Sequence, residues 1–336
     1  MHFASKGKYL SPRELKIRNH VCVLPCGGIP PNGSTVWDQL ELAPYVHFIS
    51  DERETPPMFG GFVFLGICSR PGRFLHPLYT AFGTPADKGD WMDWIYSLFS
   101  PDCNLQALSV QTRRPLDVWV SIPYPDSHQT DFGYVNGRRL NFQIEDDRYE
   151  AVKWWMDCFL ERFEQETSLK EKLQLRGFLW TRESIDAKDE HVVIETNKYV
   201  RANGYLSMWL PHYGGSGAIK FNRLGFHVAA FHSNYYGNTD YGVEWIDQTA
   251  LFARLLHAGM QIIYGKGVLY NDTHLFDYLN LGLPDKNDYM RDCFLVYQFP
   301  NQKLKDMCIS HPDEYKLIYS FIKGDYDNSS YPGITY

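Results

Sequence analysis

The stretch Leu173–Ile185, with the sequence LQLRGFLWTRESI, decides how the rest of the chain is interpreted. Its apolar part is short and rich in aromatic residues, and charged stretches of helical character flank it, which predicts a buried strand of a parallel sheet. The strand ends in Trp180, Arg182 and Glu183, at the carboxyl edge where α/β proteins bind ligands. The alternative for these charges is a surface salt bridge at a strand end.

Seven other apolar runs of similar length occur along the chain, and helical stretches separate most of them. The eight predicted strands lie near Val21, Phe62, Val118, Phe178, Met208, Ala229, Ile262 and Leu295. Regular alternation of strand and helix predicts a parallel sheet in a single α/β domain, and eight units predict a (β/α)8 TIM-type barrel. We expect a polar N-terminal arm at 1–19, the barrel at 20–325 and a C-terminal tail at 326–336. A further run, Tyr45–Ile49, is also β-like.

Motifs for common cofactors are missing from the sequence. The first predicted strand is followed by Gly27-Gly28 and then by Pro30-Pro31, which cannot open a helix over a pyrophosphate. The chain contains no GxxxxGKS loop, no GxSxG elbow and no HExxH motif. We therefore predict no cofactor.

Composition limits the partners that the protein can have. The 336 residues include 33 Lys and Arg against 40 Asp and Glu, and this acidic balance argues against a nucleic-acid partner. No run of about 18 apolar residues predicts a membrane span. The N-terminus lacks the apolar stretch of a signal peptide, so the protein is cytoplasmic or carries a leader outside this sequence. Oligomeric state is left open.

Aromatic and polar residues follow several predicted strands, and in a barrel these strand ends would converge on one mouth. The residues are Tyr124, Asp126, Trp180, Arg182, Glu183, His212, Tyr213, His232, Asn234, Tyr235, Tyr236, Tyr264 and Lys266. Tyr and Trp combine an apolar face with a polar group, which suits a sugar ring. The predicted ligand is therefore a carbohydrate, bound by Tyr124, Trp180, His212, Tyr213, His232, Asn234, Tyr235 and Tyr264.

Glycoside hydrolysis requires two carboxyl groups that flank the scissile bond. Glu183 is the candidate for the general acid, because Trp180 and other aromatic residues nearby would desolvate it and raise its pKa. Arg182 should face the opposite side of the strand, because adjacent strand residues alternate. Asp126 is the predicted second catalytic carboxylate, and the other loop candidates are Asp51, Asp240 and Asp272.

A metal site is an alternative for the same strand ends. His212 and His232, together with Asp126 or Glu183, could ligate a metal and support a metal-dependent hydrolase. A single His at a strand end is more often a hydrogen-bonded polar group, however, and we predict no metal.

The order and spacing of several short motifs resemble domain-of-unknown-function family 4855, from about His20 to Pro300. The matching stretches are Ile122–Pro125 with Gln129, Phe132-Gly133, Leu140–Phe142, Gly177–Trp180 with Glu183, Trp209–Tyr213, and Leu224–Phe226 running to Ser233–Tyr235. The family is a group of bacterial proteins placed with the glycoside-hydrolase-like (β/α)8 barrels. The resemblance implies a barrel and a role related to carbohydrates, but no particular reaction.

Two features depart from the family pattern. The seventh predicted strand runs into Tyr264-Gly265-Lys266, where the family has glutamates, and His232 stands where the family has Gln. The missing acid removes the usual nucleophile position of retaining barrel glycosidases. The hypotheses are therefore a glycoside hydrolase with Glu183 as general acid/base, or a non-catalytic carbohydrate-binding barrel.

Overall fold

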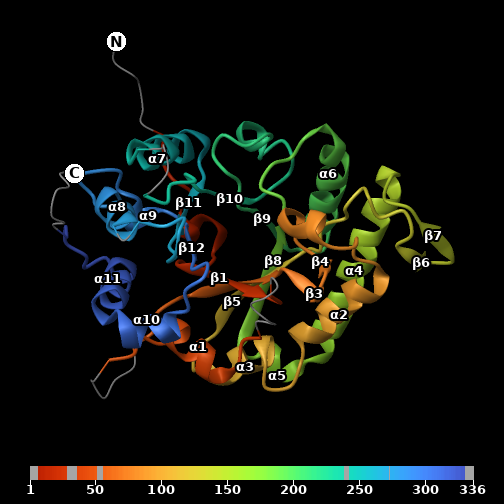
Figure 1. Cartoon of the computed structure of the whole chain (residues 1–336), viewed down its shortest axis with the longest axis horizontal. Coiled ribbons are helices and arrows are strands. Elements are labelled where there is room, and N and C mark those ends of the chain that lie inside the picture. Colours follow the sequence, from red (N-terminus) through yellow and green to blue (C-terminus); the bar gives the residue numbers. More distant parts are fainter. Residues whose placement is uncertain (1–6, 29–35, 51–55, 238–241, 272, 330–336) are drawn as a thin grey trace, which may run out of the picture.

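Eight parallel strands close into a barrel in the computed structural model, which describes residues 7–28, 36–50, 56–237, 242–271 and 273–329 (Figure 1). The barrel strands are β1 (Val21–Cys26), β2 (Gly61–Gly66), β5 (Leu116–Ser121), β8 (Leu173–Trp180), β9 (Leu206–Trp209), β10 (Val228–Phe231), β11 (Gly259–Ile263) and β12 (Leu295–Gln298). Their order around the barrel follows the chain, and β12 pairs with β1 to close it. The predicted (β/α)8 barrel and the positions of all eight strands are confirmed.

Helices on the outside of the barrel follow most of the strands (Figure 1). They are α1 (Gln39–Val46), α2 (Lys88–Leu98), α3 (Asn104–Gln111), α4 (Glu145–Gln165), α5 (Thr167–Lys170), α6 (Ala187–Ala202), α7 (Glu244–Leu256), α8 (His274–Leu281), α9 (Tyr289–Asp292), α10 (Leu304–Ser310) and α11 (Pro312–Lys323). The β-like character predicted for Tyr45–Ile49 is wrong for Tyr45, which lies in α1. Beyond α1, His47 makes an isolated bridge to Pro57.

Alternation along the strands divides the buried side chains into two cores. One set fills the barrel and includes Val23, Leu65, Leu179, Met208 and Leu210, while the other set lies between the strands and the helices. Because side chains of a strand point to opposite faces in turn, the parity of a residue decides which core it joins. The same parity decides which polar residues beyond the strand ends can reach the mouth.

The amino-terminal end of the barrel is closed by residues from the segment expected to form an arm. Leu10 and Ile17 are buried in the barrel-filling core. Asp117, fully buried near the start of β5, accepts a hydrogen bond from the backbone N–H of Arg18 at 2.6 Å and lies 3.0 Å from Arg176 Nε. These residues therefore fill the end of the barrel opposite to the carboxyl ends of the strands.

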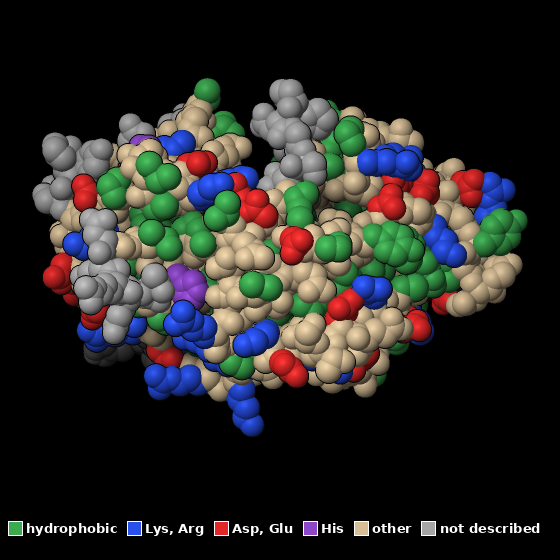
Figure 2. Space-filling view, turned by 90° about the horizontal axis from the view of Figure 1, so that it is seen from below, with side chains coloured by type: hydrophobic (Ala, Val, Ile, Leu, Met, Phe, Trp, Pro, Cys, Tyr) green, Lys and Arg blue, Asp and Glu red, His purple; other side chains and the backbone are tan. Residues whose placement is uncertain are grey.

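The outer surface carries charges of both signs. In the view of Figure 2, acidic and basic side chains are mixed over the face and do not separate into two halves. Over the described part of the chain, none of the helices combines the length and apolarity needed to cross a membrane.

Gly177 leaves no room for a side chain where β8 passes β9. A Cβ atom at this position would lie 1.7 Å from the backbone oxygen of Leu206. We expect Gly177→Ala to lower the free energy of unfolding by about 3 kcal/mol, because the strands would have to separate. Urea unfolding monitored by Trp fluorescence measures this loss. The control is Gly89→Ala in α2, where the new Cβ would approach the Asp87 carboxylate at 3.2 Å. Equal stability of the two variants would contradict the prediction.

Candidate functional site

Glu183 stands at the mouth of the barrel, three residues beyond the end of β8. Its side chain is 55% exposed, so the carboxylate faces the open end. The loop that carries it is fixed on both sides: Trp209 Nε1 donates to the carbonyl oxygen of Arg182 at 2.7 Å, and the N–H of Ile185 donates to Ser216 at 2.8 Å. The position of the carboxylate is thus set by the neighbouring strand β9 and the loop after it.

Two histidines from the next strands flank this carboxylate. His212 and His232 follow Leu210 and Ala230 by two residues, so they continue the inward-facing rows of β9 and β10 and form a bridge with each other. His232 Nε2 lies 3.3 Å from Glu183 Oε2, and only 2% of the His232 side chain is exposed. Neither His232 Nδ1 nor His212 Nε2 has a hydrogen-bond partner among the described residues. The predicted meeting of Glu183, His212 and His232 is found in the structure.

His76 and Tyr79 reach the same place from the loop after β2, and the sequence analysis missed both. They belong to the start of a short 3-10 helix, η2 (Pro77–Phe82), which follows the hairpin of β3 (Cys68–Arg70) and β4 (Arg73–Phe74). Burial lowers the pKa of His76 to about 4, although the charge of Glu183 acts in the opposite direction. Burial and the charge of Glu183 both raise the pKa of Tyr79 and of Tyr236.

A cavity of about 80 Å³ lies between these groups at the top of the barrel core. Its polar lining includes Glu183, His76, Tyr79, Gln261 and Gln298, and most of its apolar lining comes from the barrel-filling core, with Leu78 and Trp180 in addition. Gln261 donates to Gln298 Oε1 at 2.9 Å, while its own Oε1 has no hydrogen-bond partner within the described ranges. These two glutamines, also missed, are polar residues at inward positions of apolar strands, and that pattern was visible in the sequence.

The three histidines determine the charge of Glu183. Burial raises its pKa, but the interaction with His232 and the charges of His232, His76 and His212 outweigh burial, so the pKa lies below its ordinary value. The expectation of a raised pKa is therefore wrong. In the free protein Glu183 is a carboxylate, which suits a hydrogen-bond acceptor or a base rather than an acid.

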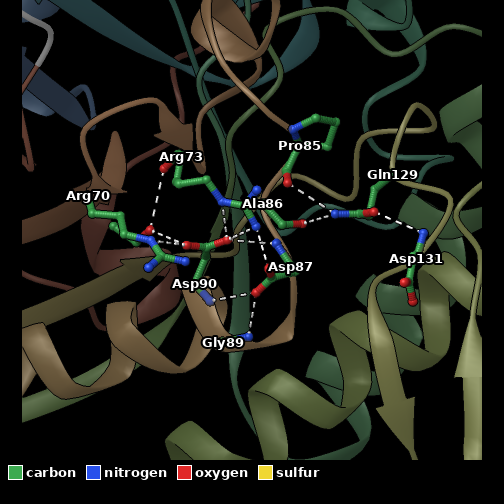
Figure 3. A network of polar contacts seen from close by, with 10 residues as sticks. Arg70, Arg73, Pro85, Ala86, Asp87, Gly89, Asp90, Gln129 and Asp131 are labelled. Atoms are coloured by element: carbon green, nitrogen blue, oxygen red, sulfur yellow. Dashed lines mark hydrogen bonds and ion pairs between the residues drawn. The ribbon is translucent and has the colours of Figure 1, made fainter.

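A polar network holds the loop that carries His76 and Tyr79 (Figure 3). Asp90 of α2, which is fully buried, accepts from Arg73 Nε at 2.6 Å, from Arg70 Nε at 3.1 Å and from the Ser69 hydroxyl at 3.0 Å. The same carboxylate accepts from the backbone N–H of Asp87, which caps α2. The hairpin is thereby fixed to the helix beneath it, and η2 follows directly from this hairpin.

The far end of the same loop is fixed by Gln129 (Figure 3). Its side-chain amide donates to the carbonyl oxygens of Pro85 and Ala86 at 3.1 and 2.9 Å, and its Oε1 accepts from the N–H of Asp131 at 2.9 Å. The loop from β2 to α2 is therefore anchored on both sides of η2.

Tyr124 and Arg182 lie away from the centre of the mouth, whereas Trp180 lines the cavity over Glu183 although its ring packs toward the helices. Tyr124 donates to Asp189 of α6 at 3.2 Å, and its ring contacts Trp180 in the layer between barrel and helices. Arg182 binds Asp186 at 3.0 Å and pairs with Asp189. The prediction that Arg182 faces away from Glu183 is confirmed, and the parity that turns Arg182 outward also turns Trp180 outward.

The remaining predicted ligand-binding residues bond to neighbouring elements. Tyr213 donates to Gln248 of α7 at 3.0 Å, and Asn234 accepts from the hydroxyl of Tyr236 at 2.8 Å. Tyr235 donates to Asp277 of α8 at 2.6 Å, and Tyr264 donates to Glu314 of α11. Of this group, the ring of Tyr213 packs against His212 and so borders the mouth.

Asp126 belongs to a turn beside the mouth. Burial raises its pKa, but bonds from the N–H and ring of His128 and from Thr80 hold the pKa below its ordinary value. The groups that act most strongly on Glu183 are histidines, and Asp126 is not among them. The other acids considered, Asp51, Asp240 and Asp272, lie outside the described residues, as do Pro30 and Pro31. Within the described ranges, no three His, Cys, Asp or Glu side chains converge as a metal site requires.

Comparison with known proteins gives one match. The family model described as "Domain of unknown function (DUF4855)" matches residues 28–322, which include all the barrel strands after β1. No curated protein matches the chain significantly.

Asp90 provides a test of the loop anchor. We expect Asp90→Asn to lower the free energy of unfolding by about 3 kcal/mol, because Arg73 would lose its buried counter-charge. Urea unfolding measures this change, and limited proteolysis of the loop should become faster. The control is Asp131→Asn, which removes an exposed partner of Arg139. A loss as large in the control as in Asp90→Asn would refute the buried anchor.

The lowered pKa of His76 predicts that the stability of the protein depends on pH. The folded pKa of about 4 is below the ordinary 6.5, so the unfolded chain binds more protons and stability falls as the pH falls from about 6.5 to 4. We expect His76→Gln to remove this contribution. The slope of the unfolding free energy against pH, expressed as protons taken up on unfolding, should then fall by up to about one proton. Unfolding free energies at several pH values measure the slope, with His311→Gln as the exposed control. An unchanged slope in His76→Gln would contradict the assignment.

Proposed function

The chain belongs to the DUF4855 family, and we propose that the mouth of its barrel binds a carbohydrate with the ionised Glu183 at the centre of the site. The observation that carries this proposal is a set of buried polar atoms at the mouth: Gln261 lines the cavity, His232 lies beside Glu183, and His212 is bridged to His232. His232 Nδ1, His212 Nε2 and Gln261 Oε1 have no hydrogen-bond partner among the described residues. Buried polar groups are almost always paired, so unpaired groups at the mouth support a polar ligand.

The chemistry of these atoms suits a ligand with several hydroxyl groups. Glu183 and Gln261 Oε1 accept hydrogen bonds, whereas each histidine ring can donate or accept according to its tautomer. A sugar hydroxyl does both, so neighbouring hydroxyls can pair with neighbouring groups of the site. The rings of Tyr79 and Tyr236 near Glu183 add the apolar surface that one face of a sugar ring requires.

Glycoside hydrolysis is the second candidate, and the pair formed by His232 and Glu183 favours it. The imidazole lies 3.3 Å from the carboxylate without a hydrogen bond, and a small shift of the ring would give the contact that general acid–base catalysis requires. Because Glu183 starts as a carboxylate, it would first act as a base toward water and return the proton later. Asp126 remains the proposed second carboxylate, and its bonds to His128 and Thr80 would have to yield to a substrate.

Glu183→Gln tests both candidates in one experiment. We expect wild-type protein to bind glycans on an array, and the variant to bind about 10- to 100-fold more weakly, because a charge-assisted hydrogen bond becomes a neutral one. Hydrolysis of each bound glycan is assayed in parallel, with Glu171→Gln, an exposed residue far from the mouth, as control. Turnover that disappears in Glu183→Gln alone supports the hydrolase. Wild-type protein that binds no glycan would refute the proposal.

A further inference from the structure

A second and larger cavity lies beside the one over Glu183. It has a volume of about 420 Å³ and lies where β1 and β12 end, next to the segment that leads into α10. Its lining includes Trp37, Tyr79, Gln298, Gln302, Lys303 and Asp306. The sequence analysis assigned no role to this region, because the predicted site followed β5 and the strands from β8 to β11.

The two cavities share a wall. Ile67, Tyr79 and Gln298 line both of them, so the space over Glu183 and the space beside Trp37 lie next to each other. Ligand sites usually measure about 300 to 1,000 Å³. The larger cavity falls within that range, whereas the cavity over Glu183 is far smaller. The smaller one can therefore enclose only one end of a ligand, whose remaining part would extend into the larger one.

The larger cavity has a lining of mixed polarity, and its one lysine is already paired. Lys303 Nζ lies 3.0 Å from Glu41 Oε2 and 5.6 Å from the centre of the Trp37 ring, so the amine is not free for an anionic ligand. Gln302 Oε1 is buried and has no hydrogen-bond partner in the described part of the chain. A neutral ligand that donates a hydrogen bond fits these groups better than a charged one.

We propose that the two cavities form one cleft, and that its ligand is a neutral oligosaccharide of at least two units, with one end at Glu183 and a following unit beside Gln302. This inference rests on the proposed function, because it assumes that the mouth binds a carbohydrate. Tyr79 is part of the shared wall, and the loop that carries it is anchored through Asp90 and Gln129 (Figure 3), so the position of Tyr79 between the two cavities is fixed.

The experiment compares ligand length in three proteins. Cello-, malto-, xylo-, manno- and chito-oligosaccharides of one to six units are titrated calorimetrically into the wild type, Gln302→Ala and the control Gln165→Ala. For the series that binds, we expect affinity to rise about tenfold or more from one unit to three and then to level off. Gln302→Ala should weaken binding of the trisaccharide about 3- to 10-fold and leave the single sugar unchanged, since one hydrogen bond is lost.

A second variant tests the cleft independently, in case Gln302→Ala fails to fold. Asp306 is exposed and lies on α10 at the edge of the larger cavity, so Asp306→Trp should fill the cavity without touching Glu183 and should abolish the gain with length. Equal affinity for one unit and for longer chains in the wild type would overturn the cleft and leave the proposed function intact. A length gain that persists in both variants would also overturn it. Failure of all five series to bind would refute the proposed function, and this inference with it.

Discussion

Closure of the parallel barrel is the constraint on which the rest of the structure depends. A closed sheet of alternating side chains has a fixed inside, and β12 pairs with β1 in the same parallel sense as every other pair of neighbouring strands. Inward positions near the carboxyl ends therefore face one another across a short distance. Gln261 and Gln298 meet there although they come from different strands, and His212 and His232 meet in the same way beyond the ends of β9 and β10. Below them the middle of the barrel is apolar, and the buried charge of Asp117 lies at the opposite, amino-terminal end.

Much of the fold could be predicted from the sequence because each strand is marked locally. A buried parallel strand is a short apolar run between helical stretches, and the chain contains eight of them. Parts of the site followed in the same way: Glu183, His212 and His232 are polar residues directly beyond such runs. The run that begins at Tyr45 was assigned as β-like, but Tyr45 lies in α1. The run is too short for its hydrophobic periodicity to distinguish a strand from a helix.

The errors in the site have two physical sources. One is parity: Leu179 points into the barrel, so Glu183 follows the inward row and Trp180 faces the helices with Tyr124. The other is distance along the chain. His76 and Tyr79 reach the mouth because a buried carboxylate more than ten residues later fixes their hairpin, and no local pattern marks such a contact. The pKa of Glu183 was misjudged for the same reason, since its direction depends on three histidines from separate segments.

The polar end of the barrel also has a cost for the fold. A buried donor or acceptor without a partner destabilises the protein by about 1 to 3 kcal/mol, and several such atoms lie at or beside the mouth among the described residues. An apolar lining like that of the lower barrel would avoid this cost. The same atoms would form hydrogen bonds with a hydroxyl-bearing ligand without further desolvation of the protein. Groups that destabilise the free protein would therefore strengthen binding of such a ligand. Glu183 fits this account as a carboxylate: its pKa lies below the ordinary value, with His232 the strongest lowering influence, and an ionised group can act as the central acceptor of the site.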